Sequence, residues 1–119
     1  MSDQSVLVVD DNEAVRLVAS EMLKRLEFDV TCVGSGPEAL ATLQETSFDI
    51  VLLDIGMPEM SGIEAYDHLR EFAPVQNVVF MTGYSKEEIT GLDDERTWIL
   101  PKPFTMDDLT KVLADVSLS

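Results

Sequence analysis

Residues 48–62, which read FDIVLLDIGMPEMSG, decide the fold of this chain. Residues 50–53 form a short apolar run of strand length, and the run stops at a carboxylate, Asp54. Loop and turn residues follow it: Gly56, Pro58 and Gly62. A buried strand that ends in one acid and then breaks into a loop is how α/β proteins build their sites. We therefore expect the rest of the chain to be arranged around Asp54.

Strand-like and helix-like segments alternate along the chain. We expect five strands, at residues 6–9, 29–33, 49–53, 78–81 and 98–100. The first, third and fourth are unbroken apolar runs, as expected of strands that are buried on both faces. The second alternates and the fifth is short, as expected at the edges of a sheet.

A helix is expected after each strand. Four of these helices begin with Ser or Thr followed three residues later by Glu or Asp, which is the signature of a capping box, at residues 35–38, 61–64, 85–88 and 105–108. The fourth helix should be short and end at Gly91, and the third should run to about Phe72. Helical periodicity predicts the buried positions of the first, third and last helices: Val15, Val18, Met22 and Leu26; Ile63, Tyr66 and Leu69; Leu109, Val112, Leu113 and Val116.

These elements predict an α/β fold, a doubly wound (βα)5 flavodoxin-like sandwich of three layers with a parallel sheet in the order 2-1-3-4-5. No repeat, linker or low-complexity segment interrupts the alternation, so residues 1–119 are expected to form a single domain.

The composition narrows the classes of partner. The net charge is −15, from 23 acids against 8 bases, which repels phosphate backbones and anionic membranes. We expect no direct nucleic-acid partner and no membrane insertion, because no apolar run approaches the ~20 residues of a membrane span. A single cysteine fits a reducing compartment, so the cytoplasm is expected. Cys32 is expected to be buried in the second strand, and His68 to be solvated on the third helix.

Polar and small residues stand where the predicted strands end: Asp10-Asp11, Gly34, Asp54, Thr82-Gly83 and Lys102. Because the carboxyl ends of parallel strands lie at one edge, three carboxylates, a hydroxyl and an ammonium should meet there. Three carboxylates at close quarters cannot all stay ionised without a cation. With no His or Cys among them, the donor set favours a hard ion such as Mg²⁺.

The other groups at this edge suit a phosphoryl group. Thr82 can donate a hydrogen bond, Gly83 lets a backbone N–H approach, and Lys102 supplies a positive charge. Phosphoryl transfer needs positioning and charge neutralisation more than covalent help, and Asp54 is the natural carboxylate nucleophile. Asp10-Asp11 could also serve only as the N-cap of a helix.

Together these residues resemble the receiver domain of two-component response regulators, the CheY-like family. The motifs that carry the resemblance are Asp10-Asp11, Asp54 with Met57-Pro58 and Gly62, Thr82-Gly83, and Lys102-Pro103-Phe104. The resemblance implies that Asp54 accepts a phosphoryl group from a histidine kinase or a histidine phosphotransfer protein in a Mg²⁺-dependent reaction. Such a domain is not an enzyme for other substrates, but it catalyses its own phosphorylation and dephosphorylation.

The resemblance also implies a role for each residue at the site. Asp11, Asp54 and the Gly56 carbonyl would ligate Mg²⁺ directly, and Asp10 would act mainly through water. Lys102 would contact the phosphoryl group.

Two further roles concern the signal. The bond between Lys102 and Pro103 is expected to be cis. Thr82 would follow the new phosphate and switch a surface that binds a downstream protein effector.

Several positions depart from the family pattern. Ile99 stands three residues before the lysine, where the family usually has an aromatic residue, and Trp98 is one residue earlier. Either Trp98 substitutes through altered packing or the aromatic switch is missing. Gly56 and Tyr84 hold positions that tune dephosphorylation in the family. Because Gly56 has no side chain to orient a water molecule, we expect a slow to moderate loss of phosphate.

The segment between Thr82 and Lys102 is also short for the family, and the chain is similar to receivers fused to hybrid histidine kinases. The sequence leaves open whether the chain is a free-standing regulator, a relay intermediate or part of a longer protein.

Other functions fit less well. A Mg²⁺-dependent phosphatase with an aspartate nucleophile would need a second acid two residues after Asp54, where Gly56 stands. A degenerate receiver that only binds would have lost the acids or the lysine, and all are present. A flavodoxin-like cofactor binder is excluded because the first strand ends in acids rather than in a phosphate cradle.

Overall fold

A five-stranded parallel sheet forms the centre of the protein. The computed structural model describes residues 4–83 and 96–118. The strands are β1 (Ser5–Val9), β2 (Asp29–Val33), β3 (Ile50–Asp54), β4 (Asn77–Thr82) and β5 (Thr97–Pro101). Their order is β2-β1-β3-β4-β5, and every neighbouring pair is parallel. The predicted fold class and strand order are confirmed.

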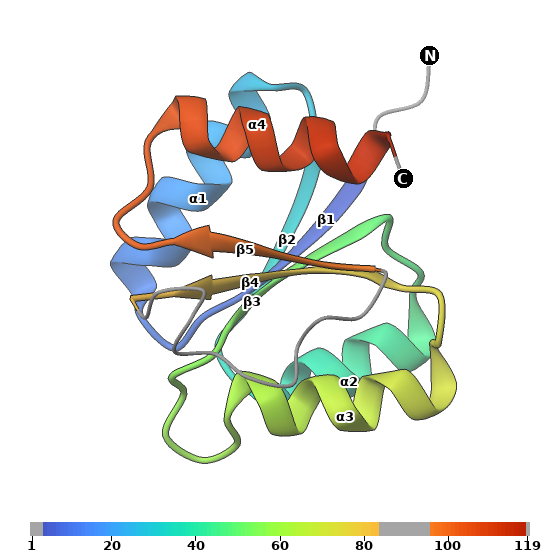
Figure 1. Cartoon of the computed structure of the whole chain (residues 1–119). Helices are drawn as coiled ribbons and strands as arrows, with labels where there is room; N and C mark the ends of the chain where they lie inside the picture. The colour runs from blue at the N-terminus through green and yellow to red at the C-terminus, as the bar shows by residue number, and fades with distance from the viewer. Residues whose placement is uncertain (1–3, 84–95, 119) are drawn as a thin grey trace.

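Two helical layers enclose the sheet (Figure 1). The helices are α1 (Glu13–Arg25), α2 (Gly36–Glu45), α3 (Gly62–Phe72) and α4 (Met106–Ser117). In Figure 1, α1 and α4 cover one face of the sheet, and α2 and α3 cover the other. The helix expected at residues 85–91 lies outside the described residues. None of the described helices is long and apolar enough to cross a membrane.

Each face of the sheet has its own apolar core. Val6 and Val8 of β1 pack with α1 and α4 in one cluster, whereas Leu7 and Val9 pack with α2 and α3 in the other. All four side chains are fully buried, because β1 has a strand on each side and a helical layer over each face. This double burial explains why the central strands read as continuous apolar runs.

The capping signals place the helix starts. Ser61 and Thr105 form reciprocal capping boxes with Glu64 and Asp108 at the first turns of α3 and α4. At α2 the Ser35 hydroxyl accepts from the Glu38 N–H, but no reciprocal bond closes the box. The N-cap of α1 is Asn12, whose side chain accepts from two backbone N–H groups, so Asp10-Asp11 do not cap this helix.

Three expected burial assignments are wrong. In α1 the side chain of Val18 is 49% exposed, and the small Ala19 together with Leu23 faces the sheet instead. In α3 the side chain of Ile63 is exposed, and Ala65 takes the inner position. In both helices an alanine lies at the face against the sheet, whereas the larger apolar side chain one or two positions before it is exposed.

Cys32 is the third correction, because its side chain is exposed rather than buried. It lies on β2, which among the described strands is an edge strand paired with β1 alone. Its sulfur is 3.9 Å from the backbone carbonyl of Arg16 on α1. His68 is exposed on α3, as expected.

The turn after α1 contains a left-handed residue. Glu27 has a φ of 68°. Its N–H donates to the Lys24 carbonyl and the next N–H, of Phe28, donates to the Leu23 carbonyl, which is the bond pattern of a Schellman motif. Glycine is usual at this position, so Glu27 holds a conformation that costs a side-chain-bearing residue free energy.

Candidate functional site

Three carboxylates meet at the carboxyl edge of the sheet. Asp54 is the last residue of β3, and Asp10 directly follows β1, which pairs with β3. Asp10 is fully buried, Asp54 is 6% exposed, and Asp11 is exposed. One oxygen from each of the three lies within 4.8 Å of the others. The structure confirms that these acids, which come from separate segments, lie close together.

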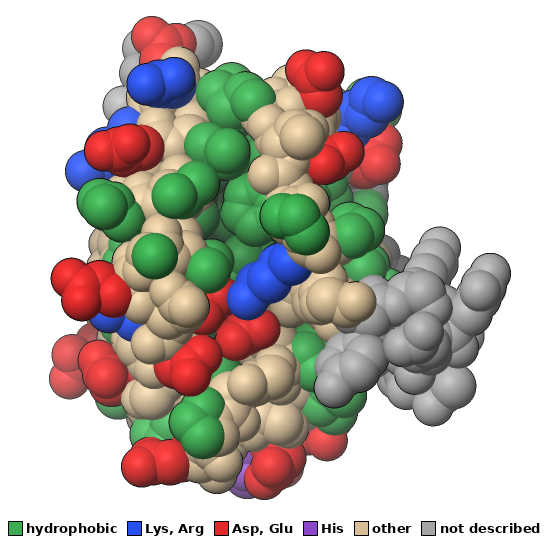
Figure 2. All heavy atoms as spheres, turned by 90° about the vertical axis from the view of Figure 1, so that its left-hand side faces the viewer, with side chains coloured by type: hydrophobic (Ala, Val, Ile, Leu, Met, Phe, Trp, Pro, Cys, Tyr) green, Lys and Arg blue, Asp and Glu red, His purple; other side chains and the backbone are tan. Residues whose placement is uncertain are grey.

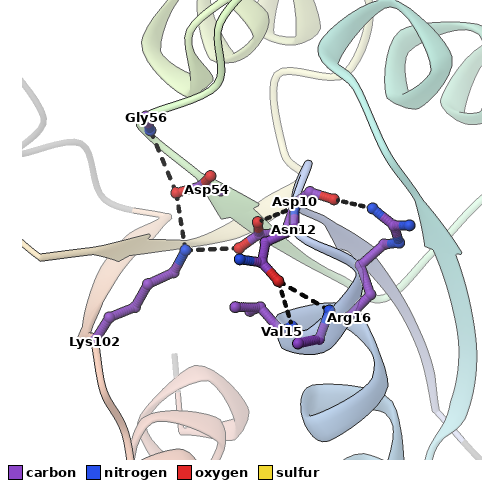
Figure 3. Close-up of polar contacts among 8 residues, drawn as sticks. Asp10, Asn12, Val15, Arg16, Asp54, Gly56 and Lys102 are labelled. Atoms are coloured by element: carbon purple, nitrogen blue, oxygen red, sulfur yellow. Dashed lines mark hydrogen bonds and ion pairs between the residues drawn. The ribbon is translucent and has the colours of Figure 1, made fainter.

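Lys102 bridges two of these acids (Figure 3). Its ammonium lies 2.6 Å from Asp10 Oδ2 and 3.1 Å from Asp54 Oδ1. The Lys102–Pro103 bond is cis, as expected. The backbone N–H of Lys102 donates to the Thr82 carbonyl at 2.8 Å, which holds the lysine in place. A residue far along the chain is thereby placed between the tips of β1 and β3.

The carboxylate oxygens differ in their freedom to bind a further group. Both oxygens of Asp10 have partners, because Oδ1 accepts from the Asn12 N–H and Oδ2 from Lys102. Asp54 Oδ1 accepts from Lys102 and from the Gly56 N–H. Within residues 4–83 and 96–118, neither Asp54 Oδ2 nor the carboxylate of Asp11 has a hydrogen-bond partner. These are the oxygens open to a ligand.

Burial and charge shift two pKa values at the site. Burial raises the pKa of Asp54, and the adjacent Asp10 raises it further, against the opposing effect of Lys102. Burial alone would lower the pKa of Lys102, but its hydrogen bonds to Asp10 and Asp54 together outweigh burial and raise it. The lysine therefore stays charged at neutral pH and acts as an internal counterion.

Small and hydroxyl residues complete this edge. Thr82 ends β4 and is 2% exposed, and it pairs in register with Pro101, next to Lys102. Gly56 and Gly83 are exposed, and a Cβ on either would meet no atom of residues 4–83 and 96–118 within 4 Å. The backbone at both glycines is therefore open to an approaching ligand. Tyr84 lies outside the described residues.

The donor set fits a divalent cation. Three carboxylates against the single ammonium of Lys102 leave a formal charge of −2 in the cluster. All of the side-chain donors are oxygens, the ligands that Mg²⁺ prefers. Near the centre of the face at this edge, a basic side chain lies beside acidic ones, with hydrophobic side chains gathered above it over the layer of α1 and α4 (Figure 2).

Trp98 and Ile99 lie on opposite faces of β5. Side chains alternate along a strand. Trp98 packs with the cluster under α1 and α4, as does Leu100, so Ile99 points to the opposite face of the sheet. Trp98 therefore lies on the opposite side of the sheet from position 99, where the family usually has an aromatic residue.

Two residues that support the site were not anticipated. Asn12 caps α1 and donates its N–H to Asp10, and an Asn before an apolar-periodic segment is a signal that could have identified this cap. Arg16 donates to the Asp10 carbonyl at 2.7 Å (Figure 3). Nothing in the sequence around Arg16 marks it out, because the contact depends on how α1 packs beside β1.

Comparison with known proteins agrees with this geometry. The model of the family described as "Response regulator receiver domain" matches residues 6–114. The chain is 36% identical over 111 residues to transcription factor SKN7 of Candida albicans, and the match covers 92% of this chain and 20% of that protein. It is 38% identical over 102 residues to probable histidine kinase 5 of Oryza sativa, covering 85% of this chain and 8% of that protein. The chain thus spans about a fifth or less of these curated relatives.

Solved structures resemble the whole chain. Chemotaxis protein CheY4 of Vibrio cholerae is 31% identical with a TM-score of 0.89, covering 97% of this chain and 99% of that one. TrrA of Thermotoga maritima, solved in complex with Mg²⁺-BeF, is 26% identical with a TM-score of 0.83, covering 95% and 98%. The acids at the strand ends, the bridging lysine, the strand order and these matches lead to one conclusion: the chain belongs to the response regulator receiver domain family, the phosphoacceptor signalling domains of two-component systems.

Proposed function

We propose that residues 1–119 act as a single receiver domain in which Asp54 accepts the phosphoryl group. The observation that carries the proposal is the position of Asp54. It ends a buried central strand, it is bonded to Lys102, and one of its oxygens is open to a ligand. Its raised pKa makes it more basic than an ordinary carboxylate, which favours attack on phosphorus.

The proposed donor is a phosphohistidine on a histidine kinase or a histidine phosphotransfer protein. A carboxylate oxygen of Asp54 forms a bond to phosphorus as the phosphorus–nitrogen bond breaks, and the imidazole leaves and takes up a proton. Lys102 moves from the carboxylate to the phosphoryl oxygens, where its charge offsets theirs. Thr82 donates its hydroxyl and Gly83 its N–H to the same oxygens. The domain thus catalyses only the gain and loss of its own phosphoryl group.

Mg²⁺ held by Asp11, Asp54 and the Gly56 carbonyl, with Asp10 acting through water, would neutralise charge on the transferring group. The open oxygens of Asp11 and Asp54 support this division, because both oxygens of Asp10 already have protein partners.

The proposed partners are proteins. Leu17 and Val18 of α1 are 61% and 49% exposed, one turn beyond the acidic cluster. Exposed apolar side chains beside a reactive group suit a docking helix of the phosphodonor. The net charge of −15 argues against nucleic acid, and a cytoplasmic location is part of the proposal.

The output would be a change in a surface that a downstream effector binds. Movement of Thr82 toward a phosphoryl group would be transmitted to β5 and α4 through the hydrogen bond from the Lys102 N–H to the Thr82 carbonyl. Because Ile99 replaces the usual aromatic residue, we propose that this surface switches without an aromatic rotamer change.

Intact mass after incubation with Mg²⁺ and acetyl phosphate tests the proposal. We expect one added phosphoryl group on the wild type and on Asp67→Ala, a control acid exposed on α3. Asp54→Ala and wild type in EDTA should gain none. An unmodified wild type that also fails to bind beryllofluoride would make the chain a binding-only receiver. Steady hydrolysis of phosphate esters without an adduct would favour a phosphatase.

A further inference from the structure

Arg16 of α1 lies next to the acidic cluster. Its Nη1 donates to the Asp10 carbonyl at 2.7 Å (Figure 3). A Cβ on Gly34 would lie 3.3 Å from the same nitrogen and 3.9 Å from Glu38 Oε1. The guanidinium therefore lies between the tip of β1, the residue after β2 and the first turn of α2. Figure 3 shows it on the side of Asp10 away from Lys102.

The residue that depends on this contact is Asp11. Within residues 4–83 and 96–118 its carboxylate has no hydrogen bond, so only the backbone sets its direction. The carbonyl of Asp10 and the N–H of Asp11 share one peptide plane, and Arg16 anchors that plane. The next plane carries the Asn12 N–H, which donates to Asp10 Oδ1 at 2.9 Å. The two anchors together fix the bond along which the Asp11 side chain leaves the backbone.

We infer that Arg16 is a positioning residue, which holds the Asp10–Asp11 peptide so that the Asp11 carboxylate is aimed at the cation site. The inference rests on the proposed function, in which Asp11 is a metal ligand. Arg16 acts through its hydrogen bond and touches neither the cation nor the phosphoryl group.

Its charge makes the inference testable. Within the described part of the chain, Arg16 forms no ion pair, so its positive charge adds to the field around the cluster. Electrostatics alone therefore predicts that a neutral side chain at position 16 would tighten the binding of a cation. A positioning role predicts weaker binding in the same variant, because the Asp11 side chain is no longer held and must be ordered when the cation binds. The direction of the change separates the two effects.

Arg70 provides a matched control. It is also part-buried, and its guanidinium donates to the backbone carbonyls of Ala73, Gln76 and Arg96. These contacts lie at the amino edge of the sheet, opposite the acidic cluster. Replacing either arginine with methionine removes bonds from a guanidinium to carbonyl groups, but only Arg16→Met disturbs the peptide before Asp11.

The experiment is a titration of the full chain with MgCl₂, followed through amide shifts in two-dimensional NMR spectra, together with urea unfolding in EDTA. We expect Arg16→Met to weaken Mg²⁺ binding about tenfold or more, the range found for residues that orient metal ligands. Arg16→Lys, which keeps the charge and one donor, should recover part of the loss. Arg70→Met should lower the urea midpoint and leave the affinity within about twofold of wild type.

Unchanged or tighter binding in Arg16→Met overturns the inference, and so does equal weakening in Arg70→Met, which would indicate general loosening. If Arg16→Met does not fold in EDTA, Arg16→Gln is titrated with the same expectation, since its shorter side chain cannot reach the carbonyl. A wild type that does not bind Mg²⁺ overturns the proposed metal site, and this inference with it, whatever the variants do.

Discussion

Replacement of Gly62 by alanine should damage the fold at the end of β3. Gly62 begins α3, and its N–H donates to the Ile55 carbonyl at 2.9 Å. A Cβ at this position would lie 2.2 Å from the carbonyl oxygen of Asp54 and 2.8 Å from both its carbon and the Ile55 Cα. All three are backbone atoms, so no side chain can turn away to relieve the contact.

The size of the effect follows from these distances. Contacts below 3.0 Å essentially never occur for real Cβ atoms, so α3 and the end of β3 must separate by about 0.8 Å, from 2.2 to 3.0 Å. Overpacking of this kind costs about 1–3 kcal/mol, and the strained hydrogen bond to Ile55 about 0.5–1.5 kcal/mol more. The better helix propensity of alanine returns up to about 1 kcal/mol. We expect a net loss of about 2–3 kcal/mol in the free energy of unfolding.

Urea unfolding in EDTA measures this loss. With a slope of about 1–3 kcal/mol/M, the midpoint of Gly62→Ala should fall by roughly 1–2 M. Gly56→Ala and Gly83→Ala are matched controls, because a Cβ there meets nothing within 4 Å in the described part of the chain and neither glycine has a left-handed φ. They should stay within about 0.5 kcal/mol of wild type. If Gly62→Ala is as stable as these controls, the close approach of α3 to Asp54 is wrong.

Four further predictions address charge, backbone and function. Because the pKa of Asp54 is raised, the folded state keeps a proton that the unfolded chain has lost, so in EDTA the free energy of unfolding of the wild type should fall as pH rises from near 3.8 toward neutrality. Urea titrations of Asp54→Asn should lack this fall, and the same dependence on pH in both proteins would contradict the prediction. Glu27→Gly should gain about 0.5–1 kcal/mol by relieving the φ of 68°, measured as a higher midpoint, whereas an unchanged or lower midpoint would show that the turn is not strained. Gly56→Asn should speed loss of the phosphoryl group about tenfold, which lowers the activation free energy by about 1.4 kcal/mol, because the new amide can orient a water molecule. Time courses of intact mass measure this rate, and Gly56→Ala should match the wild type. Leu17→Ser should slow phosphorylation by a histidine phosphotransfer protein several-fold but leave acetyl phosphate labelling unchanged, and an equal effect on both donors would argue against docking through α1.

Much of the architecture is a local property of the sequence. The apolar runs and their contrast between central and edge strands predicted the order of the sheet, because burial on two faces demands apolar residues at every position. The Ser and Thr caps located the starts of α2, α3 and α4, because an N-cap bond forms within a few residues of sequence. The convergence of Asp10, Asp54 and Lys102 followed from the topology alone.

Only the tertiary structure decided how these elements contact one another. Whether Val18 or Ala19 of α1 faces the sheet depends on the rotation of the packed helix, and the exposure of Cys32 depends on which helix atoms cover an edge strand. The placement of Lys102 between two carboxylates and of Arg16 behind Asp10 joins groups that are far apart in the chain or on different elements. Such contacts leave no local periodicity, because they arise from the packing of one element on another.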